Sequence, residues 1–600
     1  MDAVLENATI HQRRQTLCRM TNGIGSDDAY SATLSRIQEQ KGNKLKLGME
    51  AVRWVSHSER PLKAQELCHA LAVEVGTTDL NVHNVASMRP LLSCTLGLIT
   101  VDEQISTMRL VHFTLQEYLS AHPTLFITPH SVMAEICLTY LNFRSTSLNT
   151  ITSTTPSLPY SSCYWGFHAR KEITEGVKPF ALRHLKRDAT HISADILLRE
   201  EVVDFLSWGD RHHGIRHDLR GFTGLPCIAY MGIAEIAIAM IDMERWDLNG
   251  RDSNGATPLI WTIKYGNFAL ANVLLEQEGI DTTLSGNHGL TPLTHAAKVG
   301  QEGLVKLFKE RGEVDPNSRD LSGRTPLFHA ARSGHARVVA ILLGREDICP
   351  DSPDVFSQTP LPLAAKSGHE GVVKILLERG NVNPDSSDKS ARTPLSHSAQ
   401  WGDDRVVKML LGREDVNPDS SNRNGRTPLS YAAESGHEGV VKTLLERGNV
   451  NPNSSDRIGW TPLLYAASRG RQGVVKVLLQ RGDVNPGSLD EYGRTPLSYS
   501  SQWGEERVAK MLLERGDVNP SSSDKSGQTP LFYAAESGHQ GVVEMLPERR
   551  NVNGHPGFQF VIALFLSSCL SFFLPFSFFS PPLVIIALDL VFMARHILYN

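Results

Sequence analysis

The sequence lacks the short patterns that assemble the common catalytic and cofactor sites. A P-loop needs a glycine-rich turn that ends in Gly-Lys to hold phosphate, and the chain contains no Gly-Lys dipeptide. The GxSxG turn of α/β-hydrolases and the HExxH helix of zinc proteases are also missing. These absences predict a protein that is not an enzyme, with no catalytic residues, no cofactor and no metal.

Paired cysteines and net charge are lacking as well. The 8 cysteines include no CxxC pair, which argues against a disulfide framework and against a zinc site. His212, His213 and His217 lie close together, but no cysteine is nearby and Gly214 disfavours a helix, so we expect an exposed loop. The net charge of −5 over 600 residues gives no basic field for nucleic acid. The N-terminus has no apolar signal segment, which predicts a reducing, cytoplasmic location.

What the chain does have is a tripeptide that recurs with a strict period. Thr-Pro-Leu returns every 34 residues, with no insertion or deletion between copies. The copies begin at Thr257, Thr291, Thr325, Thr359, Thr393, Thr427, Thr461, Thr495 and Thr529. A fixed period of this length indicates a solenoid of stacked supersecondary units. One period earlier, Thr223-Gly224-Leu225 predicts a degenerate tenth unit.

The unit that starts at Thr427 predicts two short helices and a return loop. The Thr427 hydroxyl can cap the first helix, and Pro428 stands where no backbone N–H is needed. Gly436 and Gly448 are placed to end the two helices. Apolar residues at helical spacing mark both helices: Leu429, Ala432 and Ala433, then Val440, Val441, Leu444 and Leu445. Two helices this short cannot bury their apolar faces against each other alone. The neighbouring units must therefore cover these faces and stabilise the pair.

An aspartate recurs in the return loops at one phase. We expect each carboxylate to hold the backbone of its turn, because Asp side chains accept hydrogen bonds from nearby amides. The positions are Asp252, Asp320, Asp354, Asp388, Asp456, Asp490 and Asp524.

These units resemble the ankyrin repeat over residues 221–553. The resemblance rests on TPLxxAA, followed by Gly-His and VVKxLL. It implies a mainly α solenoid of 34-residue helix-turn-helix units with return loops, which binds a protein partner through its concave face. The chain departs from the family in one respect: the usual His after TPL is replaced. His or Tyr often stands one place later, at His295, His329, His397 and Tyr431.

The segment before the repeats predicts a small helical domain with one hairpin. We expect helices over residues 31–47, 63–73 and 84–93, followed by β-like runs over 97–101 and 108–112. Helices followed by a hairpin are typical of a winged helix. Between Arg144 and Ser162, 11 of 19 residues are Ser or Thr, which predicts an exposed linker.

The N-terminal third also resembles the segment that follows the NACHT domain in fungal NLR-like proteins, a winged helix similar to one in inositol deacylases. The residues that carry this resemblance are Trp54, Arg60-Pro61-Leu62, Glu66-Leu67, residues 110–119, Tyr164-Trp165-Gly166 and His168-Ala169-Arg170. It implies the regulatory or sensor part of an NLR-like system, without the NACHT ATPase. DNA binding is not expected, because residues 61–122 hold six acidic and three basic residues.

Two tryptophans interrupt the regularity of the repeats. Trp401 and Trp503 both stand in Gln-Trp-Gly, three repeats apart, where other units have Ser, Arg, Val or Tyr. This phase is the end of the first helix, near the face where ankyrin arrays meet partners. Exposed tryptophans are typical binding anchors, so Trp401 and Trp503 are candidate partner-binding residues. The alternative is that each packs against an adjacent repeat.

The end of the chain is strongly apolar. No charged residue occurs over 556–588, and the run over 558–574 is near the lower limit for a bilayer span. Pro575, Pro581 and Pro582 interrupt it, and residues 570–583 contain only Leu, Ser, Phe and Pro. All-pyrimidine codons encode those four residues, so the tail is either a membrane anchor or an intron translated in a gene model.

The sequence therefore predicts a non-enzymatic protein-interaction scaffold. Its parts are a helical remnant over 1–50, a winged-helix-like domain over 51–122, a helical connector over 123–220 with a Ser/Thr-rich linker at 144–162, the ankyrin repeats over 221–553, and an apolar tail over 556–595. Two alternatives remain open. One is a membrane-anchored ankyrin adaptor, and the other is the C-terminal fragment of a NACHT NTPase switch.

Overall fold

The computed structural model describes residues 26–102, 104–143, 156–186, 224–243, 246–252 and 254–546. These residues form 28 α-helices and one two-stranded sheet, which confirms the expected mainly α class. The chain divides into two compact units, Met1–Asp315 and Pro316–Asn600. Part of the predicted linker (144–155), the histidines near 212 and the apolar tail lie outside the described residues. Among the helices described, none is both long and apolar enough to cross a bilayer.

The first unit begins with helices and a hairpin in the expected order. The elements are α3 (Ser26–Gln38), α4 (Asn43–His57), α5 (Ala64–Ala72), a 3-10 turn (Val82–Asn84), α6 (Met88–Cys94), β1 (Ile99–Asp102), β2 (Thr107–Leu110) and α7 (Phe113–Ala121). The two strands are antiparallel, with Ile99 opposite Leu110. The helix expected over 31–47 is wrong in one respect, because it is two helices. Gly42, with a φ of 65°, turns the chain between them.

Three further helices follow the hairpin: α8 (Pro129–Leu141), α9 (Leu158–Lys171) and α10 (Val177–Leu185). A second 3-10 turn, Pro123–Leu125, leads into α8. The end of the predicted Ser/Thr-rich linker is wrong, since residues 158–162 are the first turns of α9. Ser161 and Ser162 are buried there, because α9 packs along α8.

Several polar contacts join the winged-helix segment to α9, and Arg60 is central to them. Arg60 donates to both carboxylate oxygens of Glu66, at 2.8 and 2.7 Å. Its guanidinium also lies 5.3 Å from the ring centre of Tyr160 and 5.8 Å from that of Tyr164. Ser157, just before α9, donates to the backbone carbonyl of Glu66 at 2.7 Å. The motifs around Arg60 and Tyr164 therefore form one packed structure.

The first unit continues with three helix pairs. These are α13 (Leu225–Met231) with α14 (Ala234–Ile241), α15 (Pro258–Lys264) with α16 (Phe268–Leu275), and α17 (Pro292–Val299) with α18 (Glu302–Arg311). The first of these pairs lies at the phase of the degenerate unit expected near Thr223.

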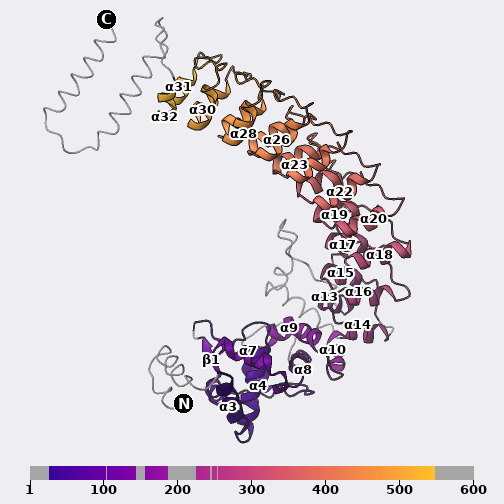
Figure 1. Cartoon of the computed structure of the whole chain (residues 1–600). Helices are drawn as coiled ribbons and strands as arrows, with labels where there is room; N and C mark the ends of the chain where they lie inside the picture. The colour runs from indigo at the N-terminus through magenta and orange to yellow at the C-terminus, as the bar shows by residue number, and fades with distance from the viewer. Residues whose placement is uncertain are drawn as a thin grey trace, which may run out of the picture. The chain divides into compact units, whose positions relative to one another are not determined.

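The second unit is a stack of seven helix pairs, which lie side by side in chain order (Figure 1). The pairs are α19 (Pro326–Ser333) and α20 (Ala336–Leu343), α21 (Pro360–Lys366) and α22 (Glu370–Glu378), α23 (Pro394–Trp401) and α24 (Asp404–Leu411), α25 (Pro428–Ser435) and α26 (Glu438–Glu446), α27 (Pro462–Ser468) and α28 (Gln472–Leu479), α29 (Pro496–Gln502) and α30 (Glu506–Leu513), and α31 (Pro530–Glu536) and α32 (Gln540–Met545). First helices pack on first helices and second helices on second helices. The apolar stripes predicted from Thr427 are buried between them.

The Thr-Pro start of each unit works as predicted. In eight of the nine units the threonine hydroxyl accepts a hydrogen bond from the amide three residues on. The exception is Thr359, whose hydroxyl lies 2.8 Å from that of Ser386. In these eight units the cap fixes where the first helix begins.

Candidate protein-interaction surface

Each recurring aspartate organises the turn that precedes a first helix. In Asp490, one oxygen accepts hydrogen bonds from the amides of Tyr492 and Arg494, at 2.9 and 2.8 Å. All seven aspartates of this phase make the same pair of bonds, to the residues two and four places on. The expectation that they hold the turn backbone is confirmed.

The second oxygen of these carboxylates binds a side chain of the first helix. Tyr465 donates to Asp456 at 2.6 Å, and Tyr499 donates to Asp490 at 2.7 Å. His329 Nε2 lies 2.9 Å from Asp320 in the same way. His397 Nε2 lies 3.4 Å from Asp388, so His329 and His397 both stand one place later than in the usual repeat where they can reach this carboxylate. His329, Tyr465 and Tyr499 therefore stabilise the repeat, a role that the sequence alone did not reveal.

The tips of the turns expose apolar side chains. We call the following residues the fingertip set; each lies within two places of a recurring aspartate, and their exposed fractions range from 40% to 75%: Leu321, Val355, Phe356, Ile458, Leu489 and Tyr492. Sequence reasoning missed this set, because single apolar residues at variable positions look like core residues. The signal that could have found them is their position in the return loops, within two places of the recurring aspartate.

The two candidate tryptophans lie at the opposite end of the first helices. Trp401 ends α23 with 60% of its surface exposed, and Trp503 directly follows α29 with 61% exposed. Neither is buried against an adjacent repeat. A first helix of eight residues is about 12 Å long, so fingertips and tryptophans border the same row of helices.

Basic side chains dominate the exposed charges at these two borders. In the second unit the exposed cations at the fingertips and first-helix ends are Arg319, Arg332, Lys366, Lys389, Arg423, Arg457, Arg469 and Lys525. The exposed anions at the same phases are Glu491 and Glu536. The surface therefore combines apolar side chains with a positive charge.

Other aromatic residues of this region are tied into the stack. The Arg426 guanidinium lies 4.3 Å from the ring centres of both Tyr431 and Tyr465, which belong to successive repeats. Trp460 packs between Tyr465 and Tyr499, at 5.0 and 4.8 Å. These aromatic residues therefore connect successive repeats, whereas Trp401 and Trp503 remain exposed to solvent.

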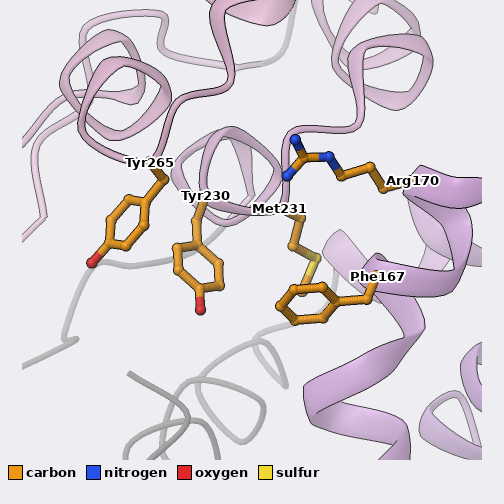
Figure 2. Close-up of a pocket in the computed structure, with 5 residues that line it drawn as sticks. All are labelled: Phe167, Arg170, Tyr230, Met231 and Tyr265. Atoms are coloured by element: carbon orange, nitrogen blue, oxygen red, sulfur yellow. The ribbon is translucent and has the colours of Figure 1, made fainter. Parts of the chain in front are cut away.

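A small pocket lies elsewhere, in the first unit. It has a volume of about 60 Å³ and is lined by Phe167, Arg170, Tyr230, Met231 and Tyr265. Figure 2 shows the Met231 thioether beside the Phe167 ring, with Tyr230 between Met231 and Tyr265. Such a volume accommodates a few water molecules but no cofactor.

Comparison with protein families supports the two-part organisation. The family of ankyrin repeats, in three-copy form, matches residues 278–354, 348–422, 400–488 and 483–554. From residue 278 on, the units are ankyrin repeats. The winged-helix domain of GPI inositol-deacylases matches residues 36–125, and so begins before the boundary expected at 51. No curated protein matches the chain.

Proposed function

We propose that the ankyrin array is a non-enzymatic recognition module that binds a protein partner across its row of first helices. The observation that carries this is the pair of exposed tryptophans at one phase, three repeats apart. Large side chains that stay exposed on a rigid scaffold are the usual anchors of an interface. The fingertip set supplies a second apolar border along the same row.

The charge of the surface favours an acidic partner. Eight exposed cations border the row of first helices in the second unit, against two exposed anions. Complementary charge speeds association and selects among partners, while apolar anchors supply most of the affinity. The expected partner is therefore an acidic segment that carries apolar side chains.

Selection from a random displayed-peptide library on the purified full chain tests this proposal. The expected result is a set of peptides rich in Asp and Glu with two or more apolar residues, whose binding weakens with added salt. Peptides without an acidic bias, or binding unaffected by salt, would contradict the acidic partner. Peptides that bind the double variant Trp401→Ala/Trp503→Ala as well as the native chain would contradict the surface itself.

We further propose that the recognition module serves as the sensor or regulatory part of an NLR-like system. The support is that a winged-helix match and ankyrin repeats occur in one chain. A regulatory role requires that partner binding change the first unit. Hydrogen exchange of α4 to α7 with and without a selected peptide measures this, and unchanged exchange would leave a scaffold without a regulatory role.

A further inference from the structure

Three side chains with metal-ligating atoms meet inside the first unit. Glu59 follows α4, His130 lies in the first turn of α8, and His168 lies near the end of α9. Their ligand atoms all lie within 4.8 Å of one another. His168 Nδ1 is 2.9 Å from His130 Nδ1 and 3.9 Å from Glu59 Oε1. We call these three residues the His-Glu cluster.

The spacing suits one small cation. Ligands about 2.0–2.2 Å from a tetrahedral ion lie about 3.3–3.5 Å apart. The two distances from His168 Nδ1, 2.9 and 3.9 Å, bracket this value. All three ligand atoms lie within 4.8 Å of one another, so rotation of the side chains toward one point would close the site around an ion. Without an ion, the two facing imidazole nitrogens share a single proton. Once that proton moves to the far nitrogen of its own ring, both facing lone pairs are free to bind an ion beside the Glu59 carboxylate.

The surroundings hold the imidazole of His168 in place. His168 is fully buried, and its other ring nitrogen lies 2.9 Å from the Tyr160 hydroxyl. That hydroxyl also accepts a hydrogen bond from the Glu59 amide at 3.1 Å. A partner on the far nitrogen of a ligating histidine orients the ring and selects its tautomer.

Protonation and charge are compatible with an ion. Burial lowers the pKa of His168 to about 3 and also lowers the pKa of His130, so both imidazoles are neutral near pH 7. Neutral imidazole is the form that ligates metals. Lys171 donates to Glu59 Oε1 at 2.7 Å, but a carboxylate has about four acceptor positions and can hold an ammonium and a metal together.

We propose that Glu59, His130 and His168 bind one divalent transition-metal ion, with Zn²⁺ favoured by two imidazoles and a carboxylate. Three protein ligands leave a fourth position for water. The ligands come from the winged-helix segment, α8 and α9, so the bound ion would tie these three parts of the first unit together. Nothing in the sequence pattern marks this cluster, since its members are 38 or more residues apart.

Calorimetric titration of the chelator-treated full chain with Zn²⁺ tests the proposal, alongside the Tm with and without the ion. The native chain is expected to bind one Zn²⁺ and to gain several degrees in Tm. His130→Asn and Glu59→Gln are each expected to bind at least about tenfold more weakly and to lose the gain in Tm. His83→Asn, an exposed histidine of the same unit, is the matched control and should behave like the native chain.

Two results would overturn the proposal. One is that the native chain takes up no Zn²⁺. The other is that His130→Asn and Glu59→Gln bind it as tightly as the His83→Asn control. Glu59 is half-buried on a loop, so its variant keeps the test meaningful even if His130→Asn folds poorly. Absorption bands of tetrahedral Co²⁺, added in place of Zn²⁺, report the ligand set directly, and circular dichroism of each variant shows whether it has folded.

Discussion

At the scale of single residues, a glycine and a histidine fit together across successive repeats. Gly402, after Trp401, has a φ of 81° and leaves room for the ring of His437 in the next repeat. His437 Nε2 donates to the Gln400 carbonyl at 3.1 Å. Gly334 with His369 and Gly504 with His539 repeat the arrangement. In these three pairs, a glycine after the first helix of one repeat makes room for a histidine at the start of the second helix of the next repeat.

Gly402→Ala is therefore expected to destabilise the array. An added Cβ would lie 2.5 Å from Nδ1 of His437, and the positive φ strains any L residue. We expect a loss of about 2–4 kcal/mol in the free energy of unfolding, measured by urea titration. Gly448→Ala is the control, because its φ is 69° and its Cβ would meet nothing within 4 Å. It should cost only about 1 kcal/mol, and equal losses would contradict the proposed contact.

His397 gives the array a dependence on pH. Burial, aided by the Arg392 guanidinium, lowers the pKa of His397 to about 4, against about 6.5 in an unfolded chain. Between these values only the unfolded state binds the proton. The contribution of His397 is therefore complete above about pH 6.5 and declines, by on the order of 3 kcal/mol, as the pH falls to about 4.

His397→Tyr is expected to remove this part of the acid sensitivity. Tyrosine occupies the same phase in other repeats, where Tyr465 donates to Asp456, and it does not titrate in this range. The measurement is the free energy of unfolding at pH 7 and at pH 4.5, for the native chain and the variant. An identical pH dependence in both would contradict the role assigned to His397.

Single residues also show where sequence reasoning stops. The bonds from Asp490 to its turn follow from local geometry, because donor and acceptor are within four residues. The bond from Tyr499 to the same carboxylate spans nine residues and depends on how the turn meets the helix. The His-Glu cluster forms only where the loop after α4, helix α8 and helix α9 pack together, so no local sequence pattern predicts it.

At the scale of elements, the sequence predicted helices well where local signals are strong. Thr-Pro starts placed nine first helices, from α15 to α31, and the β-like runs over 97–101 and 108–112 placed the two strands to within two residues. It failed at residues 158–162, where a composition rich in Ser indicated a linker. Tertiary packing decides there: Ser157 bonds to the Glu66 carbonyl, and Ser162 is fully buried.

The start of α5 depends on one buried carboxylate. Glu66 is 3% exposed, accepts two bonds from Arg60 and also accepts one from the Lys63 amide at 2.8 Å. Glu66→Gln removes the charge that balances Arg60 and leaves that guanidinium without its ion pair. We expect a loss of about 2–4 kcal/mol in the first unit.

Hydrogen exchange of the α5 amides measures this effect directly. Glu74→Gln is the control, since Glu74 is exposed and its carboxylate accepts one described hydrogen bond, from the Asn84 side chain. It should leave α5 exchange unchanged. Slow α5 exchange retained in Glu66→Gln would show that the ion pair is dispensable.

At the scale of the whole molecule, a recurring arginine joins successive repeats of the second unit through a hydrogen bond to the preceding repeat. Arg413 donates to the Leu377 carbonyl at 2.7 Å, and Arg481 donates to the Leu445 carbonyl at 2.9 Å. Arg515 does the same to Leu479 at 2.7 Å. Each guanidinium satisfies a carbonyl at the end of the preceding second helix, where cations are favoured. These bonds connect the second helices on which the first helices pack.

The central claim is that Trp401 and Trp503 serve binding and not folding. Both are about 60% exposed, so their loss should change the free energy of unfolding by no more than about 0.5 kcal/mol. If the two tryptophans are binding anchors, their loss should instead weaken partner binding at least tenfold, or by about 1.4 kcal/mol. The matched control is Val82→Ala/Ile127→Ala, which removes two exposed apolar side chains far from the repeats in sequence.

The most direct measurement is the affinity of a selected acidic peptide for Trp401→Ala/Trp503→Ala, taken together with the urea midpoint of the same variant. The account predicts at least tenfold weaker binding at an unchanged midpoint, with the control pair at native affinity. Native affinity combined with a clearly lowered midpoint would show that the tryptophans support the fold, and would contradict the account.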